Sequence, residues 1–125
     1  MIRHILAIDD SAAMREIIRA TLTSAGYQVT LAQDGDEGLE HALATSFDLV
    51  LTDQHMPGRT GLDLIASLRG NPSYQTTPIL ELTTESGDSF KATARAAGAT
   101  GWIEKPFDPE MLTELVAALG APSHA

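Results

Sequence analysis

The sequence contains no cysteine and few basic residues. Without cysteine, neither a disulfide framework nor a thiolate metal site is available. Its 8 lysines and arginines are outnumbered by 17 aspartates and glutamates, which gives a formal net charge of −9. Nonspecific binding to nucleic acid or to an anionic membrane needs a positive surface, so this composition disfavours both partners. The acidic excess instead leaves carboxylates free to hold a hard cation.

Two further absences concern location. No apolar run approaches the roughly 20 residues of a membrane span, and residues 1–4 lack the pattern of a signal peptide. We therefore expect a cytoplasmic protein that does not insert into membranes. A length of 125 residues, 43% of them hydrophobic, is typical of one domain with one core. We expect this domain to span 1–125, with a frayed tail at 120–125.

Strand and helix patterns alternate along the chain. Short apolar runs predict strands at 4–8, 29–31, 47–52, 78–82 and 101–104. Helical periodicity predicts helices at 12–25, 36–44, 61–68, 88–97 and 108–119. Gly26 and Gly98 follow two of these helices, where glycine commonly ends a helix. Five consecutive strand–helix units indicate an α/β domain with a parallel sheet that helices cover on both faces.

Polar side chains follow several of these strands at the point where each strand ends. Asp9 and Asp10 follow the first strand, and Asp53 follows the third. Thr83 follows the fourth strand, and Lys105 follows the fifth. In open α/β sheets the ligand site lies beyond the carboxyl ends of the strands, where the strand order reverses. If strands one, three, four and five are neighbours, these side chains share one pocket.

Such a pocket has a definite chemistry. Clustered carboxylates repel one another unless a cation joins them, and oxygen ligands favour Mg²⁺. Lys105 would be a point charge for a phosphate oxygen or for Asp53, and the Thr83 hydroxyl would donate a hydrogen bond to a second phosphate oxygen. A carboxylate beside Mg²⁺ can attack phosphorus to form an aspartyl phosphate. Catalysis would then consist mostly of positioning and charge neutralisation.

Four stretches of the sequence together resemble a known family. They are AIDDS (7–11), LTDQHMPG (51–58), LTTES (82–86) and GATGWIEKPFDP (98–109). As an ordered set they resemble the receiver domain of two-component response regulators, most closely its single-domain chemotaxis (CheY-like) type, over essentially the whole chain. The resemblance implies a doubly wound, flavodoxin-like five-stranded parallel sheet of order 2-1-3-4-5. It also implies a signalling module whose only chemistry is to accept a phosphoryl group and to lose it by autodephosphorylation.

The resemblance assigns roles in the pocket. Asp53 would be the phosphoacceptor. Asp9 and Asp10 would bind Mg²⁺ together with Asp53 and the backbone carbonyl of His55. Side chains at His55 and at Glu85 would tune how water reaches the phosphoryl group.

The resemblance also implies a conformational switch. Thr83 would be the switch hydroxyl, and Trp102 would be the switch aromatic. Lys105 would contact the phosphoryl group, and the bond between Lys105 and Pro106 would be cis. Thr83 would move toward the phosphoryl group, and Trp102 would then swing inward. The changed surface would comprise the helix at 88–97, the last strand and the final helix.

The first of these helices carries two basic residues. Lys91 and Arg95 lie four residues apart and are expected to share a helix face. That face would either be simply solvated or contact an acidic partner segment. By contrast, His4, His41 and His124 are expected to face solvent, without a role in metal binding.

Three functions remain open at this point. The first is a monomeric signalling module that a CheA-like histidine kinase phosphorylates. It would either bind a flagellar motor switch protein or another protein target, or drain the kinase as a phosphate sink. A phosphatase would be a further partner. The second is a phosphatase resembling haloacid dehalogenases, but these need an acid two residues after the nucleophile, where His55 stands. The third is a flavodoxin-like electron carrier, whose phosphate Asp9 and Asp10 would repel.

Overall fold

The strands form one parallel sheet in the order β2-β1-β3-β4-β5. The computed structural model describes residues 2–85 and 87–120. The strands are β1 (His4–Ile8), β2 (Gln28–Ala32), β3 (Leu49–Asp53), β4 (Ile79–Thr83) and β5 (Gly101–Glu104). The helices are α1 (Ala12–Ser24), α2 (Gly35–Ala44), α3 (Gly61–Arg69), the short 3₁₀ helix η1 (Pro72–Tyr74), α4 (Asp88–Ala97) and α5 (Pro109–Leu119). The predicted fold class and strand order are confirmed.

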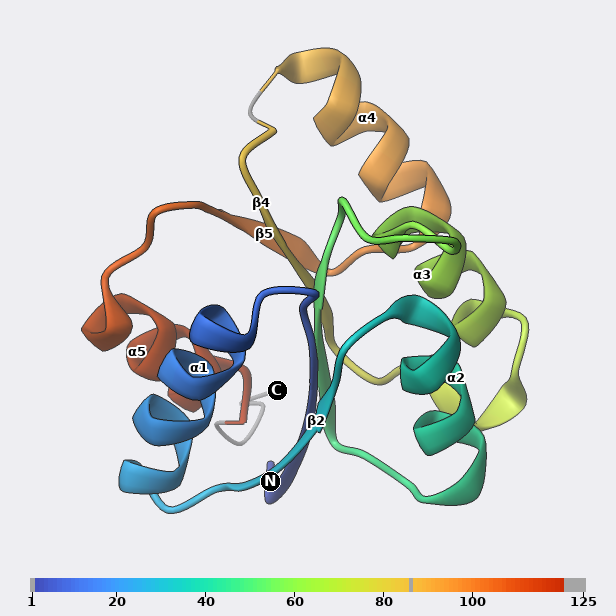
Figure 1. The fold of residues 1–125 in the computed structure, drawn as a ribbon. Helices are drawn as coiled ribbons and strands as arrows, with labels where there is room; N and C mark the ends of the chain where they lie inside the picture. Colours follow the sequence, from blue (N-terminus) through green and yellow to red (C-terminus); the bar gives the residue numbers. More distant parts are fainter. Residues whose placement is uncertain (1, 86, 121–125) are drawn as a thin grey trace, which may run out of the picture.

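Helices cover both faces of the sheet, α1 and α5 on one side and α2, α3 and α4 on the other (Figure 1). Alternating residues of the central strands feed two separate apolar clusters. In β1, Ile5 and Ala7 pack with Ile18 of α1 and Leu112 of α5. Leu6 and Ile8 of the same strand belong to the cluster that includes residues of α2 and α3. The central strands are therefore apolar on both faces, as a doubly covered sheet requires.

Local signals explain where the helices begin and end. Ser11 caps α1 by accepting a hydrogen bond from the amide of Met14. Gly98 follows α4 with a φ of 105°, a left-handed conformation that glycine adopts without strain. At the start of α4, Gly87 offers no side-chain cap. Gly120 caps the end of α5, and the rest of the predicted tail lies outside the described residues.

Several predicted boundaries were wrong by one or two residues. The third strand begins at Leu49 instead of residue 47 and ends on Asp53, because the Asp48 carboxylate accepts the amides of Arg3 and His4 next to β1. The prediction that His4 faces solvent was also wrong. Its ring is half-buried, lies 4.5 Å from the Phe47 ring centroid, and is hydrogen-bonded to the Thr30 hydroxyl at 2.7 Å.

Arg69 connects three segments that lie apart in the sequence. The Arg69 guanidinium at the end of α3 donates to the carbonyls of Tyr74 (2.6 Å), Thr77 (2.7 Å) and Gly98 (2.9 Å). It thereby connects α3, η1 and the turn between α4 and β5.

Among the described residues, no helix has both the length and the apolarity needed to cross a bilayer.

Candidate functional site

The site lies where neighbouring strands send the chain to opposite faces of the sheet. β1 and β3 are adjacent and in register, with Ile8 opposite Thr52. The next residues, Asp9 and Asp53, therefore emerge side by side at the carboxyl edge. From there the chain continues into α1 on one face and toward α3 on the other (Figure 1). This is the topological switch point at which open α/β sheets bind ligands.

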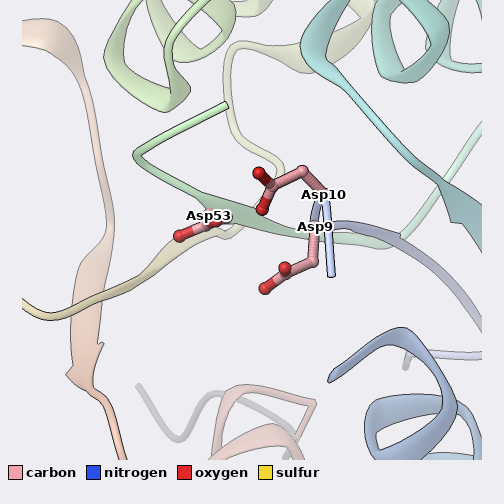
Figure 2. A group of neighbouring side chains, drawn as sticks. All are labelled: Asp9, Asp10 and Asp53. Carbon is pink, nitrogen blue, oxygen red and sulfur yellow. The ribbon is translucent and has the colours of Figure 1, made fainter. Parts of the chain in front are cut away.

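Three carboxylates gather at this edge, from Asp9, Asp10 and Asp53 (Figure 2). Asp9 and Asp53 are buried, at 0% and 6% exposure, whereas Asp10 is exposed to solvent. One oxygen from each carboxylate lies within 4.8 Å of the others. Oxygens that share one Mg²⁺ at about 2.1 Å lie at most about 4.2 Å apart. The donor set thus fits Mg²⁺ after small side-chain movements.

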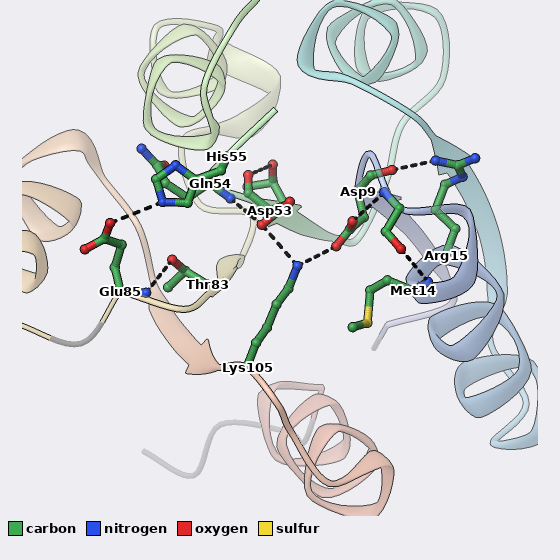
Figure 3. Close-up of polar contacts among 11 residues, drawn as sticks. Asp9, Met14, Arg15, Asp53, Gln54, His55, Thr83, Glu85 and Lys105 are labelled. Carbon is green, nitrogen blue, oxygen red and sulfur yellow. Dashed lines mark hydrogen bonds and ion pairs between the residues drawn. The ribbon is translucent and has the colours of Figure 1, made fainter. Parts of the chain in front are cut away.

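Lys105 supplies the positive charge in the same pocket. It comes from the segment after β5, and its ammonium lies 2.8 Å from Asp9 Oδ2 and 3.1 Å from Asp53 Oδ1 (Figure 3). The bond between Lys105 and Pro106 is cis, as the resemblance implied. Lys105 therefore bridges the two buried carboxylates and lies within reach of a group attached to Asp53.

The charges in the pocket shift one another's titration. Burial raises the pKa of Asp53, and the neighbouring Asp9 carboxylate raises it further, although Lys105 opposes both effects. Burial alone would lower the pKa of Lys105, but its bonds to Asp9 and Asp53 raise that pKa above its ordinary value. Lys105 therefore stays charged and opposes the rise in the pKa of Asp53, which favours its carboxylate, the form that can act as a nucleophile.

Backbone groups hold the carboxylates in place. The amide of Ser11 donates to Asp9 Oδ1 at 2.9 Å, and the amide of Gln54 donates to Asp53 Oδ1 at 2.9 Å. Arg15 of α1 donates to the carbonyl of Asp9 at 2.8 Å. Beyond helical spacing, no pattern in the sequence predicts the Arg15 contact. Lys105 contacts the other oxygen of Asp9 and the same oxygen of Asp53 that accepts from Gln54 (Figure 3).

Thr83, His55 and Glu85 lie at the same edge, as predicted. Thr83 is buried, and its hydroxyl accepts a hydrogen bond from the amide of Glu85 at 3.0 Å. The exposed His55 ring is paired with the Glu85 carboxylate at 3.2 Å. This pair joins the loop after β3 to the loop after β4 on the side of Asp53 away from Asp9 (Figure 3).

Trp102, Lys91 and Arg95 form a second group. The Lys91 ammonium lies 5.6 Å from the centroid of the Trp102 ring, and the Arg95 guanidinium carbon lies 5.1 Å from it. The two basic residues do share a helix face, as predicted. That face is not simply solvated, however, because it covers the aromatic ring of the neighbouring strand β5.

Sequence reasoning missed Glu81, in the middle of β4. Its side chain is fully buried, and within residues 2–85 and 87–120 neither carboxyl oxygen has a hydrogen-bond partner. Burial and the nearby charge of Asp53 raise its pKa to about 8. A Cβ at Gly61 would lie 2.5 Å from Glu81 Oε1 and 2.3 Å from the Asp53 carbonyl oxygen, so only glycine fits there. The available signal was an acidic residue inside the apolar run Ile79–Thr83.

The fold and this arrangement of carboxylates and lysine define a receiver domain, and comparison with known proteins agrees. The chain belongs to the response regulator receiver domain family, whose model matches residues 5–117. It is CheY-like: the chemotaxis protein CheY1 of Helicobacter pylori is 41% identical over 112 residues, which cover 88% of this chain and 90% of that protein.

Solved structures show the same similarity. CheY4 of Vibrio cholerae superimposes with a TM-score of 0.90 at 41% identity, covering 94% of this chain and 98% of that one. A response regulator from Burkholderia multivorans is 62% identical over the full length of both chains, with a TM-score of 0.85. The receiver domain of a sensor histidine kinase from Pseudomonas aeruginosa is 26% identical, with 94% and 97% coverage and a TM-score of 0.86. That structure holds a magnesium ion in its active-site cleft.

Proposed function

We propose that this receiver domain accepts a phosphoryl group from a histidine kinase on Asp53. The observation that carries this proposal is the arrangement of Asp53 between the buried Asp9 carboxylate and the Lys105 ammonium. One oxygen of Asp53 attacks phosphorus, and the bond from phosphorus to the donor nitrogen breaks as the acyl phosphate forms. The pocket contributes charge neutralisation and positioning to this transfer.

Asp9, Asp10 and Asp53, with the backbone carbonyl of His55, would hold Mg²⁺. The bound ion would neutralise negative charge on the phosphoryl oxygens. Lys105 already lies 3.1 Å from Asp53 Oδ1 and would shift its hydrogen bond to a phosphoryl oxygen. It can do so without leaving the pocket, because the same ammonium also contacts Asp9.

The buried Thr83 hydroxyl would turn toward the new dianion and donate a hydrogen bond to it. The amide of Glu85, which now donates to that hydroxyl, would lose its partner, so the loop after β4 would move with Thr83. Trp102 would then turn inward, which changes the surface formed by α4, β5 and α5. A phosphate worth a few kcal/mol of differential interaction is enough to shift such a population.

The paired side chains of His55 and Glu85 would govern the lifetime of the acyl phosphate. Hydrolysis needs a water molecule in line with the bond from phosphorus to Asp53. Because the pair joins the loops that follow Asp53 and Thr83, we infer that it restricts the approach of this water and lengthens that lifetime. Replacing Glu85 with alanine should therefore accelerate autodephosphorylation.

The output is proposed to be protein–protein binding in chemotaxis, with a CheA-like kinase as donor and a flagellar motor switch protein as target. The support is the similarity to chemotaxis proteins along most of both chains. A phosphate sink is the alternative within the same pathway. Pull-down of the motor switch protein with and without beryllofluoride, a phosphoryl mimic, separates them: a motor regulator binds more strongly with the mimic, and a sink does not bind.

The site supports neither of the other two functions, the phosphatase and the electron carrier. Two residues after Asp53, where such a phosphatase carries its acid, the chain has His55, whose ring is paired with the Glu85 carboxylate at 3.2 Å. The position therefore lacks the carboxylic acid that a phosphatase of this kind uses. For an electron carrier, Asp9 and Asp10 would repel the phosphate of a flavin nucleotide.

Intact-mass spectrometry tests the proposal. The wild-type protein is incubated with Mg²⁺ and acetyl phosphate, beside the Asp53→Asn variant. We expect the wild type to gain the mass of one phosphoryl group and the variant to gain none. A wild type that gains no mass, or a variant that gains as much as the wild type, would show that the assignment is wrong.

A further inference from the structure

Two cations of one helix converge on a single aromatic ring. Lys91 and Arg95 are one turn apart on α4, and both lie over Trp102, at 5.6 Å and 5.1 Å from the ring centroid. Cations at this range are attracted by the negative face of an indole ring. The helix and the strand β5 are therefore connected by two charges that share one partner.

The ring is the main partner that the structure offers these charges. In the described parts of the chain, no carboxylate lies within 4.0 Å of the Lys91 ammonium or the Arg95 guanidinium, whereas Arg19 and Arg59 each form such an ion pair. Two like charges near each other also repel. Their joint position over Trp102 thus depends on the ring.

The helix that carries them has little buried surface of its own. Ala94 is the one fully buried residue of α4, a helix described along its whole length. At its N-cap, Gly87 provides no side-chain hydrogen bond. Its C-terminal end is anchored where the carbonyl of Gly98 accepts a hydrogen bond from Arg69 and where Ala97 packs against the apolar cluster that includes residues of α3. The contacts of Lys91 and Arg95 with Trp102 add a link between the middle of α4 and β5.

Trp102 itself is only partly buried in this conformation. It lines a groove of ≈ 500 Å³ between β5 and α5, together with Met111 and Leu115. A ring that leaves this position to turn inward has to leave both cations. The contacts therefore stabilise the outward conformation relative to the inward one.

We propose that Lys91 and Arg95 form a cation clamp on Trp102 that favours the resting conformation and opens on activation. The clamp rests on the proposed function, since it requires Trp102 to turn inward when Asp53 is phosphorylated. Opening leaves two adjacent positive charges without their aromatic partner on the surface that changes. They are then free to bind carboxylates, so the partner segment that recognises the activated state is acidic. The clamp thus couples release of Trp102 to exposure of the binding charges.

Affinity for beryllofluoride measures the clamp, because the mimic binds the activated conformation. Titration calorimetry in Mg²⁺ compares the wild type with the double variant Lys91→Gln, Arg95→Gln, which keeps good helix propensity. We expect the double variant to bind about 5- to 10-fold more tightly, since both contacts that oppose activation are gone. The variant Lys91→Arg, Arg95→Lys retains both cations and should match the wild type.

A charge control and a second readout complete the test. Arg19→Gln removes one positive charge from α1 and should leave beryllofluoride affinity unchanged. Trp102 is the single tryptophan of the chain, so its fluorescence reports the ring directly. Without the mimic, the double glutamine variant should show less acrylamide quenching than the wild type, closer to the beryllofluoride-bound wild type.

The clamp is refuted if the double glutamine variant binds beryllofluoride no more tightly than the wild type, or if its quenching is unchanged. This failure is distinguishable from failure of the proposed function. If the wild type is phosphorylated on Asp53 and the variants do not differ, the clamp alone is wrong. If the wild type takes up neither the phosphoryl group nor the mimic, the proposed function is wrong as well.

Discussion

Replacing Glu81 with glutamine should remove a pH dependence from the stability of the folded protein. Glu81 is fully buried in β4, its carboxyl oxygens have no hydrogen-bond partner within the described residues, and its pKa rises from an ordinary value of 4.5 to about 8. The folded state therefore holds a proton on Glu81 at pH values where the unfolded chain has released it. Glutamine has the same shape and never titrates, so this difference between the two states disappears.

The sign and the size follow from the pKa of Glu81. Below about pH 4.5 the carboxyl is protonated in both states and costs nothing through ionisation. As the pH rises from 4.5 through about 8, the free energy of unfolding falls, because only the unfolded state ionises easily. At about 1.36 kcal/mol for each pH unit, the loss is roughly 5 kcal/mol once the pH exceeds 8. This is a large share of the stability of an ordinary domain.

Urea unfolding followed by circular dichroism, at intervals from about pH 5 to about pH 9, measures this effect. Asp53 also has a raised pKa, so both proteins should carry Asp53→Asn as a common background. Burial, the larger cause of the raised pKa of Glu81, remains in this background, whereas the contribution of the Asp53 charge is removed, so the fall in stability should be smaller than in the wild type. The parent should lose stability steadily with pH, and the Glu81→Gln variant should lose much less. The buried amide has its own cost, so the slope decides the test and the absolute stability does not. Parallel curves for the two proteins would refute the reasoning.

Three other substitutions have defined outcomes. Lys105→Met removes the cation that competes for the carboxylates of the pocket, so calorimetry should show Mg²⁺ binding about tenfold more tightly. Arg69→Met leaves three carbonyls without their donor, and urea unfolding should show a loss of about 2 to 4 kcal/mol. Gly61→Ala places a Cβ 2.3 Å from the Asp53 carbonyl oxygen, and unfolding should show a loss of about 2 kcal/mol or more.

Each of these outcomes has a control. Weaker Mg²⁺ binding by Lys105→Met would contradict the competition between the two cations. Arg19→Met removes an arginine whose partner is the exposed Glu16, and a loss of stability equal to that of Arg69→Met would contradict the bridging role. Gly87→Ala adds a Cβ with no atom within 4 Å, so it should be far milder than Gly61→Ala.

The repeated alternation of short apolar runs with helical periodicity was enough to predict the α/β class. The strand order came from the family resemblance, because periodicity does not say which strands are neighbours. The predicted start of the third strand was wrong because the Asp48 carboxylate accepts two backbone amides beside β1, which periodicity cannot show. The helix at 88–97 was predicted with its observed bounds, since Gly98 marks its end clearly.

The pocket was predictable because its members follow the strands directly. Asp9, Asp53 and Lys105 converge once the strand order that the resemblance implied places their strands in one sheet. Glu81 was not predicted, because its position inside an apolar strand could not show that its carboxyl would lack a hydrogen-bond partner among the residues that the structure describes. The contact of Lys91 and Arg95 with Trp102 also depends on how α4 lies against β5, and a helix face read from sequence does not specify its neighbour.

The central claim is that Asp53 becomes an acyl phosphate in a pocket that depends on a divalent cation. The most direct measurement is to trap the acyl phosphate with hydroxylamine after exposure to acetyl phosphate and to locate the hydroxamate by peptide mass spectrometry, with Mg²⁺ and with a chelator. We expect modification at Asp53 in the presence of Mg²⁺ and almost none with the chelator. Modification at another carboxylate, or equal modification of Asp53 under both conditions, would contradict it.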